Sequence, residues 1–66
     1  GREAVEDLLR AIEALPENYA SVVREVDLAE RPMGDVAAEL GRSAGAVHML
    51  RARAHDRLRE LLGGAG

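Results

Sequence analysis

The sequence predicts an all-α fold, namely a four-helix domain that contains a helix-turn-helix and lacks a winged element. Apolar residues recur at spacings of three and four along the chain, and no stretch alternates as a strand would. Tyr19 is the only aromatic residue, so the core has to be aliphatic, which suits packed helices better than sheets. With 66 residues and no cysteine, the chain indicates one small domain (residues 1–66) without disulfides or thiolate metal ligands.

The first two helices are predicted over residues 3–15 and 17–29. The apolar stripe of the first consists of Val5, Leu8, Leu9, Ile12 and Leu15. Pro16 ends this helix because the residue before a proline is pushed out of the α region. It then serves as a first-turn residue of the next helix. The inward side chains of that second helix are Tyr19, Val22, Val23 and Val26.

A third, shorter helix is predicted over residues 33–40, after the break at Glu30-Arg31-Pro32. Its apolar side consists of Met33, Val36, Ala37 and Leu40. Gly41 supplies the left-handed residue that commonly ends a helix, and Ser43 suits the N-cap of a last helix over residues 44–62. Residues 63–66 are expected to form a flexible tail.

The charge is divided unevenly between the two parts of the chain. Residues 1–41 hold four arginines and ten acidic residues, a formal charge of −6. Residues 42–66 hold five arginines and two acidic residues, a formal charge of +3. A solvated helix face explains the charge alone, but the asymmetry also suits a polyanionic partner for the second part. A short helix, a turn with glycine and a longer basic helix form the layout of a helix-turn-helix, whose second helix enters the major groove of DNA.

Three stretches carry a resemblance to a known family: "LPENYASVVREV", "VAAELGRSAGAV" and "RARAHDRLRELL". They resemble region 4 of the extracytoplasmic-function sigma factors of bacterial RNA polymerase. The matching positions are Leu15-Pro16, Val36-Ala37, Leu40-Gly41, Ser43, Gly45, Val47, Arg53-Ala54 and Arg57-Leu58-Arg59. They cover residues 3–62, nearly the whole chain.

The resemblance implies a domain that reads the −35 promoter element in the major groove while bound to the flap of the β subunit of the RNA polymerase core. It also implies an anti-sigma factor that masks the domain. No part of the chain matches region 2, so we expect an isolated domain. The chain has no apolar run long enough for a membrane span and no signal-peptide pattern. We therefore expect a bacterial cytoplasmic protein, nucleoid-associated when active, without membrane insertion.

The sequence departs from the family pattern at a few positions. Pro32-Met33 replaces the usual Ser or Thr cap and the residue after it, which weakens the start of the third helix. His48 stands where Lys or Arg is common. Leu50-Arg51 reverses a frequent Arg-Leu order, and at about 100° per residue the two side chains fall on opposite shoulders of the buried seam. We expect Leu50 to join the edge of the core and the Arg51 head group to point outward.

The expected DNA-binding residues lie at and after the turn. Arg42, Ser43 and the free backbone N–H groups that open the last helix form an anion site. Arg51 and Arg53 add contacts to flanking phosphates, which position the protein without reading sequence. Bases are read by the outward side chains Ala44, His48, Met49 and Ala52. Because this set has no arginine or asparagine fork, direct readout is expected to be modest and phosphate contacts to dominate.

Other functions remain open from the residues alone. Enzymatic activity is not expected, since Ser21 and Ser43 have no base partner and Asp35 and Glu39 suit a solvated helix face. His48 and His55 stand roughly 10 Å apart along a helix, too far to hold one metal ion, and we expect no cofactor. A response-regulator-type helix-turn-helix output domain shares the turn but usually ends sooner. A helical protein-interaction module, bound by an anti-sigma factor, would suit the acidic helices.

Overall fold

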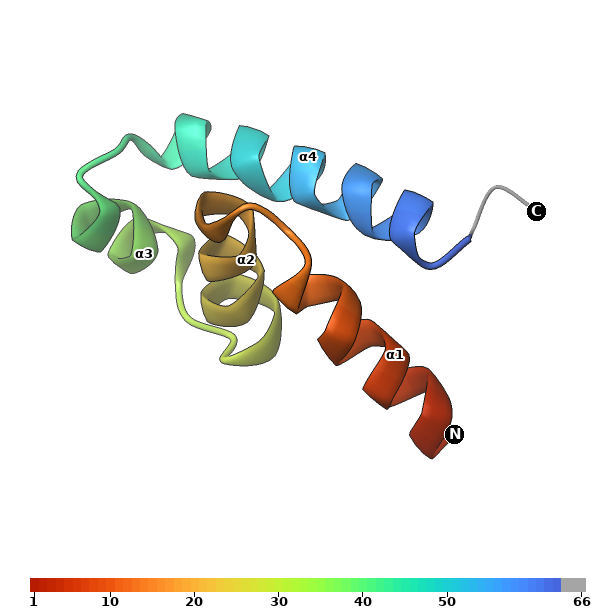
Figure 1. Ribbon diagram of the computed structural model, residues 1–66. Coiled ribbons are helices and arrows are strands. Elements are labelled where there is room, and N and C mark those ends of the chain that lie inside the picture. Colours follow the sequence, from red (N-terminus) through yellow and green to blue (C-terminus); the bar gives the residue numbers. More distant parts are fainter. Residues whose placement is uncertain (64–66) are drawn as a thin grey trace.

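The computed structural model describes residues 1–63 and shows an all-helical domain, as predicted (Figure 1). Its elements are α1 (Arg2–Glu13), α2 (Glu17–Val22), the π-helical segment η1 (Val23–Leu28), α3 (Met33–Leu40) and α4 (Ala44–Leu61). No strand occurs within these 63 residues, so they contain no wing. The flexible tail predicted at residues 63–66 lies, apart from Gly63, outside the described residues.

The second predicted helix changes pitch midway. Helix α2 continues without a break into η1, because Val23 keeps helical backbone angles. The Ala29 N–H then donates to the Arg24 carbonyl at 2.9 Å, a bond that spans five residues instead of four. The apolar spacing could not reveal this change, since Val22, Val23 and Val26 lie inward at either pitch.

Both prolines stand at N-caps, Pro16 at that of α2 and Pro32 at that of α3, so Pro16 lies one position before the first turn in which it was expected. Pro16 and Pro32 have extended backbone angles, and their carbonyls accept the first intrahelical bonds. Neither residue has a side-chain acceptor, so these helices begin without a side-chain cap. The third helix therefore lacks the side-chain cap whose loss was expected to weaken its start.

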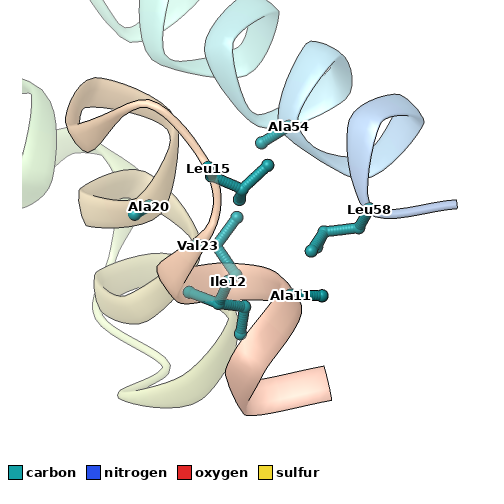
Figure 2. Close-up of a cluster of buried hydrophobic side chains, with 7 residues drawn as sticks. All are labelled: Ala11, Ile12, Leu15, Ala20, Val23, Ala54 and Leu58. Carbon is teal, nitrogen blue, oxygen red and sulfur yellow. The ribbon is translucent and has the colours of Figure 1, made fainter. Parts of the chain in front are cut away.

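The core consists of two aliphatic clusters that α4 joins. The first cluster, drawn in Figure 2, connects α1, α2, η1 and α4. Its buried members are Ala11, Ile12, Leu15, Ala20, Val23, Ala54 and Leu58. The second cluster lies under the helix-turn-helix, and its buried members are Val22, Val36, Ala37 and Val47. Helix α4 is thus held along its length by all the preceding helices.

The N-terminal half of α1 departs from the prediction. Val5 and Leu9 belong to the apolar stripe, yet they are 57% and 46% exposed. Figure 1 shows the reason, because α1 diverges from α4 toward its N-terminus and only its last turns meet the other helices. Leu61 and Leu62, at the end of α4, are similarly exposed. A surface hollow between the second half of α1 and the end of α4 is lined by Asp7, Arg10, Ala11, Leu61 and Leu62.

Candidate nucleic-acid interface

The turn before α4 is built by two residues with distinct backbone roles. Gly41 adopts φ 68° and ψ 32°, the left-handed conformation that glycine reaches without a side-chain clash. The Arg42 N–H donates to the Ala37 carbonyl at 2.9 Å, and the Gly41 N–H donates to Ala38 at 3.2 Å. This pair of bonds is a Schellman ending, which stops α3 and redirects the chain within one residue.

Ser43 then starts α4 as predicted. Its backbone is extended, and its Oγ accepts the N–H of Ala46 at 3.1 Å. The cap satisfies one of the donors that every helix N-terminus leaves without an intrahelical partner. The N–H groups of Ala44 and Gly45 remain at this end of the helix, beside the exposed Arg42 side chain.

The rotation of α4 is set by the residues that it buries. Val47 and Ala54 have no exposed surface, and Leu58 is nearly buried. Leu50 packs against the edge of the second cluster, as expected from its shoulder position. Since successive residues turn by about 100°, burial of this seam directs the opposite side of α4 to solvent.

Seven of the eight predicted site residues lie on one exposed surface. This surface is called here the recognition face. Its members are Arg42, Ser43, Ala44, His48, Met49, Ala52 and Arg53. The largest apolar side chain among them is that of Met49, which is 58% exposed, whereas Met33 is half-buried against the second cluster. No acidic residue occurs between positions 42 and 55.

Arg51 differs from the expectation that its head group points outward. Its guanidinium turns back toward η1, where Nη2 lies 2.7 Å and Nε 2.9 Å from Oδ1 of Asp27. His55, one turn later on α4, places Nε2 2.8 Å from the other carboxylate oxygen. Sequence analysis missed Asp27, although its spacing of four from the inward Val23 places it on the side of the second helix that meets α4.

The remaining arginines of α4 and its preceding turn divide into two groups. Arg42 and Arg53 form no ion pair within residues 1–63. Arg57 and Arg59 pair with Glu60 and Asp56. The free arginines of this segment are therefore Arg42, in the turn before α4, and Arg53, near the midpoint of the helix.

A second ion-pair cluster holds α3 in place. Arg31 bonds Glu25 of η1 at 2.6 Å and also contacts both carboxylate oxygens of Glu39 on α3. The hydrogen bonds to Glu39 and Glu25 raise the pKa of Arg31, and the Arg31 guanidinium in turn lowers the pKa of Glu39. Glu30, just before it, has a left-handed φ of 53°, which gives this link its sharp bend. Sequence analysis had treated Glu39 only as part of a solvated face.

Other kinds of site receive no structural support in the part of the chain that the structure describes. No group of three or more His, Asp or Glu side chains is arranged to hold a metal ion within residues 1–63. No helix in this range is both long and apolar enough to cross a membrane.

Comparison with known families agrees with the geometry of the recognition face. Residues 5–58 match the family model for sigma-70, region 4. Neither a curated protein nor a solved structure gives a significant match. The matched segment includes the two helices of the helix-turn-helix and most of the packing that orients them. The chain therefore belongs to the sigma-70 region 4 family, a helix-turn-helix DNA-binding domain of the sigma factors that act in transcription initiation.

Proposed function

We propose that this chain reads the −35 element of a promoter as region 4 of an extracytoplasmic-function sigma factor, and that it does so bound to RNA polymerase. The observation that carries this proposal is the recognition face, which is exposed, lacks acidic residues and begins at a capped helix N-terminus. A polyanion is attracted to such a face by the free arginines and by the unpaired N–H groups of the first turn.

The phosphate contacts are assigned to the start of α4 and to one side chain farther along. Arg42, the Ser43 hydroxyl and the N–H groups of Ala44 and Gly45 suit one phosphate at the helix N-terminus. Arg53 suits a flanking phosphate. These contacts set the register of the protein on the duplex but carry no sequence information.

The base contacts are assigned to the outward side chains of the first three turns. His48 can donate to an acceptor on a guanine or thymine edge. Ala44, Met49 and Ala52 can meet thymine methyl groups. Because no arginine or asparagine fork is present, we expect modest discrimination and a strong dependence of affinity on salt.

Association with RNA polymerase is assigned to the opposite end of the molecule. Leu61 and Leu62 are about half exposed at the end of α4, where they line a hollow together with Asp7, Arg10 and Ala11 of α1. The end of α4 lies away from its N-terminal half (Figure 1). This hollow suits the flap of the β subunit, and both surfaces can then be occupied together. Such a domain works at promoters, in the bacterial cytoplasm.

The DNA assignment is tested by two-dimensional amide NMR of the chain titrated with a short duplex that carries a −35-like sequence, and with a scrambled duplex. We expect shifts confined to residues 42–53 that are larger for the first duplex and fade with salt. The variant R53Q should make the fall of log K with log salt shallower by about 0.9 in slope, the value for one phosphate contact. The matched control R57Q, on the ion-paired end of α4, should leave the slope unchanged. A folded spectrum without shifts at low salt would refute DNA reading by this chain.

A protein partner on the same face is the second candidate. The exposed Met49 gives the centre of the recognition face an apolar patch, and methionine adapts well to irregular partner surfaces. An anti-sigma factor that covers Met49 would mask the DNA-reading residues directly. The variant M49A should then weaken binding of the anti-sigma factor more than binding of a scrambled duplex. The response-regulator alternative is disfavoured by the family match.

A further inference from the structure

Asp27 links the second helix to the recognition helix through both of its carboxylate oxygens. Oδ1 accepts from Arg51, and Oδ2 lies 2.8 Å from Nε2 of His55. An ionised carboxylate only accepts hydrogen bonds, so the His55 nitrogen must be the donor. The Asp27 side chain is 22% exposed.

The charge state of this cluster follows from its contacts. Burial raises the pKa of Asp27, but the hydrogen bonds from Arg51 and His55 together outweigh burial and hold the pKa below its usual value of 3.8. Asp27 is thus ionised at neutral pH. The local positive charge of Arg51 is cancelled within the domain, before any nucleic acid is present.

The position of Arg51 on α4 places this cancelled charge beside the recognition face. At about 100° per residue, Ala44, His48, Arg51 and His55 fall along one narrow stripe of the helix. Arg51 stands three residues after His48, about 4.5 Å farther along the axis. A guanidinium released from Asp27 would extend along this stripe, toward the phosphates that flank the bases assigned to His48.

We infer that Asp27 withholds Arg51 from DNA phosphates and so lowers the sequence-independent part of the domain's affinity for DNA. This inference rests on the proposed function. Phosphate contacts strengthen binding to every sequence equally. Because this component is the same for every sequence, Asp27 sets the overall affinity for DNA and its salt dependence, and leaves the ratio of affinities between sequences unchanged. Arg42 and Arg53 are left free for phosphates, whereas Arg51 is held.

The test compares the natural chain with four variants on a duplex without a −35-like sequence, by fluorescence anisotropy over a range of salt. The variant D27N keeps the shape of the side chain and its hydrogen-bonding oxygen but removes the charge that holds Arg51. We expect its log K to fall more steeply with log salt, by about 0.9 in slope. The ratio of the D27N affinity to the affinity of the natural chain should therefore shrink roughly 3.5-fold between about 50 and 200 mM salt.

The matched control is D35N, which also removes one negative charge. Asp35 is exposed on α3 and forms no ion pair within residues 1–63. D35N frees no arginine, so we expect the slope of its salt dependence to match that of the natural chain. Equal slopes for D27N and D35N would overturn the inference, since the effect would then be one of net charge alone.

Two further variants keep the test decisive even if D27N is unstable. The double variant D27N/R51Q should return to the natural slope, because no guanidinium is left to release. The single variant R51Q should also keep the natural slope, because Arg51 is already withheld. If log K of R51Q instead falls less steeply with log salt, by about 0.9 in slope, Arg51 contacts phosphate in the natural chain and the inference is overturned.

Failure of the proposed function gives a different pattern. The natural chain is measured in parallel on a duplex with a −35-like sequence. A natural chain that binds both duplexes equally refutes −35 reading, while the D27N and D35N slopes still decide the role of Asp27. If no chain binds any duplex at the lowest salt, both proposals are overturned.

Discussion

Val47→Ala tests whether the recognition helix is oriented by the core beneath it. Val47 is fully buried on α4 and belongs to the second cluster with Val22, Val36 and Ala37. The substitution removes two methyl groups, which lose about 1.6 kcal/mol of burial free energy. The cavity left behind adds roughly 1 kcal/mol. The better helix propensity of alanine returns about 0.6 kcal/mol. We therefore expect the free energy of unfolding to fall by about 2 kcal/mol.

Thermal unfolding followed by circular dichroism measures this loss. For a domain of this size, 2 kcal/mol corresponds to a decrease in Tm of roughly 8–16 °C. Met49→Ala, two residues farther along the same helix, is the matched control because Met49 is 58% exposed. It should change the free energy of unfolding by less than about 0.5 kcal/mol. A Val47→Ala effect no larger than the Met49→Ala effect would refute the placement of Val47 in the core.

Three further outcomes follow from the turn and from the charged cluster. Gly41→Ala should lower the free energy of unfolding by about 1 kcal/mol, because Gly41 has a φ of 68°. Gly45→Ala, in the first turn of α4, should raise it by roughly 0.5 kcal/mol. Urea unfolding measures both changes, and changes of the same sign would contradict the turn geometry. Ser43→Ala should lower the free energy of unfolding by about 1 kcal/mol, because the N–H of Ala46 loses its acceptor. Ser43→Asp restores an acceptor and should recover this stability in the same assay. No recovery would count against capping. Because the pKa of Asp27 is lowered in the folded chain, its stabilising contribution is fully present above about pH 4 and is lost as the pH falls through the folded-state value. The free energy of unfolding, measured with urea at pH values above about 4 and below the folded-state pKa of Asp27, should fall with decreasing pH more in the natural chain than in D27N. Identical pH profiles for the two chains would argue against the cluster.

The sequence by itself determined the local features of the fold. The helices, the left-handed Gly41 and the Ser43 cap each depend on a few neighbouring residues, whose spacing and backbone preferences are visible in the chain. The recognition face was predictable for the same reason. Once Val47 is buried, the helical repeat fixes which side chains point away from it.

Only the tertiary structure decided how residues far apart in sequence meet. Asp27 and Arg51 are separated by 24 positions, and although periodicity places Asp27 on the inward side of the second helix, it does not show that the carboxylate reaches Arg51. The divergence of α1, which leaves Val5 and Leu9 exposed, likewise depends on where α4 runs. The change to π-helical pitch at Val23 was equally hidden, since both pitches bury the same valines. Local physics therefore specified which face could read DNA, whereas long-range packing decided which of its arginines are free to do so.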